Sequence, residues 1–187
     1  MNVINSILVL ASAFLAVFGE AALPGLRNLL GAQIDLLPAL MIYAALNTNG
    51  VVVSVLAICG GLWFDSLSAN PLGISILPLF AVGFPVYLQR DLILRELPFA
   101  QLVLGGIASV LAPLASLLLL LTAGKVPLLG WGSLWQWLVM IAGGAVATPV
   151  IFIVFDWFDH ALGYQPRTET SFRSDRVISR GPKKMDF

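Results

Sequence analysis

The side chains in this sequence that could do chemistry are few, and the most informative ones lie at the ends of apolar segments. Glu20, Asp35 and Asp65 each stand where a hydrophobic stretch begins or ends, the only histidine is His160, and the only cysteine is Cys59. An enzyme inside a membrane needs a nucleophile with a base, a pair of aspartates, or metal ligands held within its helices. The apolar segments lack such sets, so we expect no enzymatic activity, no metal site and no cofactor.

The motifs that would indicate catalysis are also missing from the sequence. It contains no His-Glu-x-x-His, no glycine-flanked nucleophilic serine and no glycine loop suited to phosphate. A single cysteine within an apolar run excludes a disulfide inside the chain and reads as a small packing residue. His160 follows the last apolar segment and reads as a side chain at the membrane interface. The segments also lack the buried titratable relay that ion-coupled transport usually needs.

The spacing of the carboxylates predicts where they lie. A helix that starts at the turn around Gly50 rises about 22 Å before it reaches Asp65. This is less than the roughly 30 Å thickness of the hydrocarbon core, so Asp65 should lie just below the outer interface. Counting back from Asn47 puts Asp35 about 18 Å away, so both carboxylates should lie at similar depth near the outer face. Glu20 ends its segment on the same side. These acids either cap helices or are hydrated at the membrane edge, or they form a docking point for a partner's arginine or backbone amides.

A short loop, Asn70-Pro71-Leu72-Gly73, follows Asp65 on that outer side. Proline fixes φ and glycine permits a positive φ, so the loop should have a defined shape. A shaped loop can be a recognition surface, and it can equally be an ordinary turn.

The elements that must position these residues are helices in a membrane. Hydrophobic residues make up 59% of the 187 positions, charged residues 11%, and the mean hydropathy is +0.94, whereas a soluble domain has roughly 25% charged residues. We expect an all-α polytopic bundle of about six transmembrane helices over residues 1–158 and a flexible, mixed-charge cytoplasmic tail over 159–187. The expected spans are about 3–19, 33–46, 51–64, 74–89, 98–123 and 134–155, with a short interfacial helix at 26–30.

Positive charges predict the orientation. With six spans and the amino terminus inside, all basic residues except Arg27 and Lys125 fall on the cytoplasmic side, as the positive-inside rule requires. Both termini should therefore be cytoplasmic. The first span lacks the positive start of a signal peptide and is expected to remain as an anchor, although Ala21 and Ala22 would suit cleavage. The tail reads as a solvated topology signal, or as a contact for anionic lipid. The basic residues are too scattered for nucleic acid.

Small residues recur four apart in several of the expected spans, a spacing that lets helices approach closely in lipid. Such pairs usually pack helices within one bundle, and the same spacing would also serve a partner protein or self-association. The pairs are Ala57 with Gly61, Gly105 with Ser109, Ala108 with Ala112, and Gly143 with Ala147.

Between Asp35 and Gly73 the chain resembles the bacterial rod shape-determining protein MreD family. The matching elements are Asp35-Leu36-Leu37, Tyr43-Ala44-Ala45-Leu46, Gly50, Gly60-Gly61, Asp65 and Pro71-Leu72-Gly73, and the stretch from Tyr87 to Arg90 also fits. The sequence departs from the family at Ile34, where many members have proline, and in its longer tail.

The resemblance implies a non-enzymatic subunit of the cell-wall elongation machinery in the bacterial cytoplasmic (inner) membrane, which would control cell shape and peptidoglycan synthesis. Its fold is likened to the substrate-binding subunit of energy-coupling-factor transporters. Its partners would be an MreC-like bitopic protein and, through it, MreB, RodA and a penicillin-binding transpeptidase. The alternative is a vitamin-binding subunit of a membrane transporter. The candidate partner-binding residues are Glu20, Asp35, Asp65, Pro71, Leu72, Gly73 and Arg90.

Overall fold

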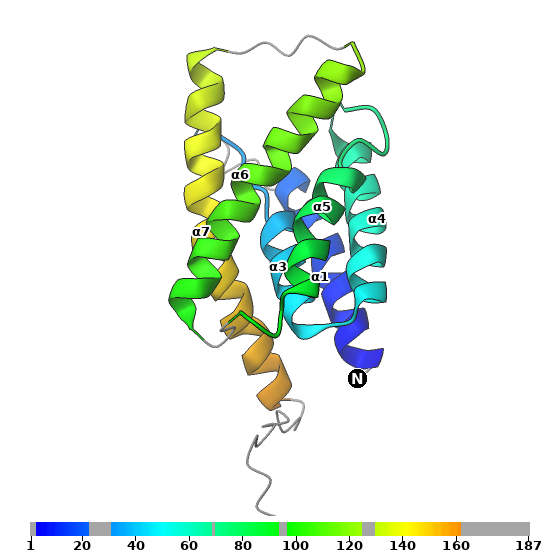
Figure 1. Ribbon diagram of the computed structural model, residues 1–187, viewed down its shortest axis with the longest axis vertical. Helices are drawn as coiled ribbons and strands as arrows, with labels where there is room; N and C mark the ends of the chain where they lie inside the picture. Colours follow the sequence, from blue (N-terminus) through cyan, green and yellow to red (C-terminus); the bar gives the residue numbers. More distant parts are fainter. Residues whose placement is uncertain (1–2, 23–30, 69, 94–96, 125–129, 162–187) are drawn as a thin grey trace, which may run out of the picture.

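The computed structural model describes residues 3–22, 31–68, 70–93, 97–124 and 130–161, and the regular elements within these ranges are all helices. The expected all-helical class is therefore confirmed for this part of the chain. The helices are α1 (Val3–Ala22), α3 (Leu37–Asn47), α4 (Gly50–Leu67), α5 (Ile76–Leu88), α6 (Pro98–Thr122) and α7 (Trp131–Ala161). Successive helices run in opposite directions, so that α1 begins and α7 ends at the same end of the bundle (Figure 1). We call this the lower end and the opposite one the upper end.

Within the described residues, four helices are long and apolar enough to cross a membrane, which makes the chain a membrane protein by length and composition. These segments are Asn5–Ala22, Gly50–Leu67, Pro98–Thr122 and Trp131–Phe158. The other two helices, α3 and α5, have only 11 and 13 residues. Their lengths of about 16 and 20 Å fall short of a core of roughly 30 Å. The expected count of six full spans is thus not confirmed.

Helix α3 is shorter than the span expected over 33–46 because of Pro38, which lies in its first turn. A helix starting at Gln33 would have placed Pro38 in its interior, where its ring would clash with the carbonyl of Ile34. The chain instead stays non-helical over residues 33–36 and begins its helix at Leu37. At the other end, Asn49 accepts a hydrogen bond from the N–H of Val52 and caps α4, which closes the tight hairpin that the sequence indicates.

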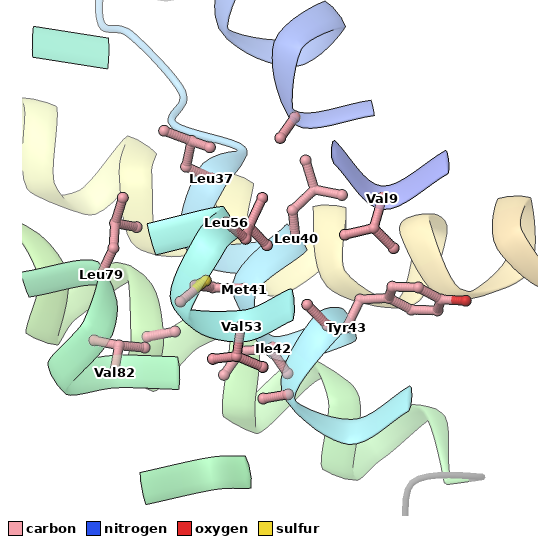
Figure 2. Close-up of a cluster of buried hydrophobic side chains, with 14 of the residues drawn as sticks. Val9, Leu37, Leu40, Met41, Ile42, Tyr43, Val53, Leu56, Leu79 and Val82 are labelled. Carbon is pink, nitrogen blue, oxygen red and sulfur yellow. The ribbon is translucent and has the colours of Figure 1, made fainter. Parts of the chain in front are cut away.

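The core of the bundle is built around α3. Ten of its eleven residues are buried, and it contacts each of the other described helices. A helix that is apolar on every face belongs in an interior rather than on a surface. Figure 2 shows its side chains enclosed by Val9 of α1, Val53 and Leu56 of α4, and Leu79 and Val82 of α5. Tyr43 of α3 also stacks on Phe155 of α7, with 4.2 Å between the ring centroids.

Small residues bring α6 and α7 into close contact, in agreement with the spacing in the sequence. A methyl group on Gly105 would lie 2.7 Å from the carbonyl oxygen of Gly144 and would overlap the side chain of Thr148. A methyl group on Gly144 would likewise overlap Ser109. These residues therefore pack helices within the bundle. Large side chains such as Leu118 and Leu138 remain exposed on the outer faces of the two helices, where lipid would cover them.

Candidate functional site

Asp65 lies in the last turn of α4 and is almost completely buried, with 2% of its surface exposed. Its carboxylate accepts hydrogen bonds from the backbone N–H groups of Gly73 (2.8 Å) and Ser75 (3.1 Å) and from the Ser75 hydroxyl (2.5 Å). A buried carboxylate is tolerated when hydrogen-bond donors surround it in this way. Asp65 thus fastens the end of α4 to the residues that begin α5.

The loop held by Asp65 has the defined shape that its sequence indicates. The N–H of Ile74 donates to the carbonyl oxygen of Pro71, and Gly73 has a φ of +92°, a conformation that side chains disfavour. Pro71 and Leu72 point outward, and Leu72 is 71% exposed. Asp65 is therefore a capping residue, as one of the two readings of the sequence proposed. Any part it has in partner binding would act through the loop, and that part remains a prediction.

Glu20 and Asp35 form an acidic pair at the upper end. Glu20 accepts a hydrogen bond from the N–H of Leu36 and Asp35 accepts one from the N–H of Leu37, both at 2.9 Å. The two carboxylates are close enough to interact electrostatically. Carboxylates at this position satisfy the unpaired N–H groups and the positive pole of a helix N-terminus. Glu20 and Asp35 thus cap α3, while Asp65 caps α5.

Gln136 of α7 fixes the non-helical segment that leads into α3. Its side-chain amide accepts from the N–H of Gln33 at 3.1 Å and donates to the carbonyl oxygen of Gln33 at 2.7 Å. Gln136 therefore pairs with the backbone as a neighbouring strand would. This satisfies both backbone polar groups of Gln33, which is exposed and has no helical partner.

A cavity of about 430 Å³ opens at this end of the bundle. Its walls come from the upper half of α6 around Leu117 and from the first turns of α7 around Trp137, and α3 and α5 contribute the residues at their N-termini. Asp35 lines the cavity, and Ser75 connects it to the Asp65 cluster. No local pattern in the sequence indicates the cavity, because the cavity depends on how far α6 and α7 separate.

Arg90 lies at the lower end, away from the other candidate residues. It donates a hydrogen bond of 2.9 Å to the carbonyl oxygen of Thr48, the C-cap of α3, and lies 4.8 Å from the ring centre of Tyr87. A cation near a helix C-terminus stabilises the helix, because it interacts favourably with the partial negative charge of the unpaired carbonyl groups there. The candidate residues therefore divide between the two ends of the bundle.

Within the described part of the chain, the remaining reactive side chains are not gathered into a site. Cys59 is half-buried in α4, and His160 in the last turn of α7 forms a hydrogen bond with the carbonyl oxygen of Asp156. Among the described residues no three histidine, cysteine, aspartate or glutamate side chains are placed to hold a metal ion. Arg27, the basic residue nearest to the acids in sequence, lies outside the described residues, as do the expected helix at 26–30 and residues 162–187.

Comparison with known proteins leaves the family open: no protein-family model matches the chain, and no curated protein or solved structure matches it significantly.

Proposed function

We propose that this protein is a non-enzymatic membrane scaffold of the MreD kind, a regulatory subunit of the bacterial cell-wall elongation complex. It would lie in the inner membrane with both termini in the cytoplasm and bind an MreC-like bitopic protein. Through that protein it would act on MreB, RodA and a penicillin-binding transpeptidase. The start of α1 and the end of α7 lie at the same end of the bundle, which supports the proposed orientation (Figure 1).

The observation that carries the proposal is the loop that Asp65 holds at the upper end. The buried Asp65 carboxylate accepts hydrogen bonds from two backbone N–H groups and one hydroxyl, and these bonds hold the loop in one conformation. In this conformation the side chain of Leu72 is exposed. An exposed leucine on a preorganised loop suits docking, because little conformational entropy is lost when a partner binds it. The proposed contact is therefore Pro71, Leu72 and Gly73, with Asp65 as the residue that positions them.

Co-purification with a co-expressed MreC-like protein tests this contact. Leu72→Asp should leave the bundle folded, because the side chain is exposed, and should reduce recovery of the partner at least about tenfold, a loss of about 1.4 kcal/mol. The matched control is Leu92→Asp, which changes a leucine that is 85% exposed at the lower end. Equal recovery by both variants, or a chain that stays alone when the partner is present, would refute the scaffold.

Asp65→Ala gives a second test in cells. The variant should still insert into the membrane but should disturb cell shape and lower partner recovery, because the loop loses its three anchoring hydrogen bonds. Asp91→Asn is the control, since the Asp91 side chain is 93% exposed and lies at the lower end. Normal shape and normal complex yield with Asp65→Ala would argue against the assignment.

The alternative function, a vitamin-binding subunit of a transporter, is favoured by one observation. The cavity of about 430 Å³ at the upper end falls in the range of about 300 to 1,000 Å³ that holds small molecules. This function predicts a tightly bound small molecule that survives purification. Native mass spectrometry of the purified protein would reveal it, and a spectrum of the bare chain would count against a transporter subunit.

A further inference from the structure

The cavity at the upper end has a composition that points to one class of ligand. Its apolar wall includes Leu117 and Leu120 of α6 and Trp137 and Met140 of α7. Most ligand pockets combine such walls with a few polar groups that fix orientation. Here some polar groups lie near the starts of α3 and α5, and α6 and α7 add others. The polar residues in the lining are Asp35, Asn70, Ser75, Ser116, Ser133 and Gln136, so that the cavity has an apolar part and a polar part.

Asp35 supplies the only charge among the described residues that line the cavity. One of its oxygens accepts the N–H of Leu37, and the other has no hydrogen-bond partner in the described part of the chain. The side chains of Asn70 and Ser116 also line the cavity without a partner in that part. The polar part of the cavity therefore offers an acceptor that carries a negative charge, with two neutral groups nearby.

The N-terminus of a helix commonly binds an anion. At the N-terminus of α3, the charge that is already present disfavours binding of a further anion. The N-terminal pole of a helix amounts to roughly half a positive charge. Two carboxylates, Glu20 and Asp35, already bind the first N–H groups there. The unit negative charge of Asp35 alone exceeds that of the pole, so the cavity should attract a cation and repel an anion.

We propose that this cavity binds an amphiphilic amine, with its apolar body between α6 and α7 and its protonated amine paired with Asp35. The ammonium group would also have Asn70 and Ser116 as hydrogen-bond partners. Such an amine could come from a soluble molecule or from a lipid with an ethanolamine headgroup, which share this chemistry. Binding of an amine at this cavity requires neither the scaffold nor the transporter function.

Cysteine labelling measures the charge preference of the cavity directly. In full-length Cys59→Ala protein, Ser116→Cys places a thiol in the cavity, and Leu72→Cys places one on the exposed loop at the same end. Each is treated with a cationic and an anionic methanethiosulfonate reagent. The ratio of the labelling rates with the cationic and the anionic reagent should be about tenfold higher for the cavity cysteine than for the loop cysteine. A unit negative charge within about 10 Å of the thiol would produce a difference of this size at an effective dielectric constant of about 20. Equal preference at the two positions would overturn the proposal.

Protection experiments test binding itself. Octylamine should slow labelling of Ser116→Cys by the cationic reagent, whereas octanol and octanoate, which have the same chain length without the amine, should not. Adding Asp35→Asn should abolish the protection by octylamine. The comparison of the three probes uses protein in which Asp35 is intact. It therefore tests whether the amine is recognised even if the Asp35→Asn variant does not fold. Equal protection by all three probes would show apolar binding alone and would refute pairing with Asp35.

Nanodiscs distinguish the two sources of the amine. In phosphatidylcholine, whose headgroup has no N–H, Ser116→Cys should label freely and octylamine should protect it. Slower labelling when phosphatidylethanolamine is included identifies a lipid ligand, and protection by added octylamine alone identifies a soluble one. No protection under either condition would overturn the proposal. This result would leave the proposed scaffold function untouched, because that function is tested by recovery of the partner protein.

Discussion

Gly61 of α4 lies against the backbone of Ile76 in the first turn of α5, with no room for a methyl group between the two helices. A methyl group on Gly61 would lie 2.9 Å from both the nitrogen and the α-carbon of Ile76. Asp65 follows one turn after Gly61, and Ser75 directly precedes Ile76. The close approach at Gly61 therefore sets the distance across which Asp65 reaches the residues that it caps.

Gly61→Ala should destabilise the protein by about 1 to 3 kcal/mol, because the backbone of Ile76 cannot rotate away from the added methyl group. The expected result is a lower midpoint of thermal unfolding in detergent. Gly60→Ala is the matched control, since its methyl group would meet the end of the Leu37 side chain at 3.1 Å, which can move. An equal loss of stability in both variants would contradict the importance of the α4–α5 contact.

Gly105→Ala should separate α6 from α7 and destabilise the protein by a similar amount, about 1 to 3 kcal/mol. The new methyl group would overlap Thr148, which itself donates to the carbonyl oxygen of Gly144. The neighbouring Gly106→Ala is the control, because its methyl group would lie 3.6 Å from Ala145, an ordinary contact. Thermal unfolding in detergent compares the two variants, and a Gly106→Ala protein that unfolds as early as Gly105→Ala would argue against this packing.

The close contact of α6 with α7 could be predicted from the sequence, and the cavity above it could not. Gly105 and Ser109 stand four apart in an apolar segment, which is a local pattern with a direct physical meaning in lipid. The cavity depends on side chains from five helices, among them Phe64, Leu117 and Trp137, which are far apart in the sequence. No local pattern encodes such an arrangement, so the cavity cannot be predicted from the sequence.

The capping residues were predicted in part. Placing Asp35 and Asp65 near the same face required only the helical rise and the tight turn at Gly50. The partners of the two aspartates lie in connections whose course depends on tertiary structure. The pairing of Gln136 with Gln33 across 103 residues belongs to the same class. Pro38, which shortens α3, is visible in the sequence, whereas apolarity alone predicts a helix that begins at Gln33.

Asp65 and Ser75 should act as a unit in stability measurements. Asp65→Asn should cost about 1.5 to 3 kcal/mol, because hydrogen bonds to a charged group contribute that much and the amide cannot accept all three donors. Ser75→Ala removes only the hydroxyl bond and should cost less. Because the residues are bonded to each other, the double variant should lose less stability than the sum of the single variants. Strict additivity in detergent unfolding would indicate that the two side chains do not interact.

Arg90 should stabilise the lower end of α3 through its hydrogen bond to the carbonyl oxygen of Thr48 and its contact with Tyr87. The Arg90 side chain is 39% exposed, so Arg90→Ala should cost about 1 kcal/mol, near the usual value for one hydrogen bond. Arg90→Lys should recover only part of this loss, because lysine lacks the planar group that stacks on an aromatic ring. Asp91→Asn should change nothing measurable, since its ion pair with Arg90 is exposed and 3.8 Å long. A loss with Asp91→Asn as large as that with Arg90→Ala would mean that Arg90 acts through the ion pair instead of through the end of α3.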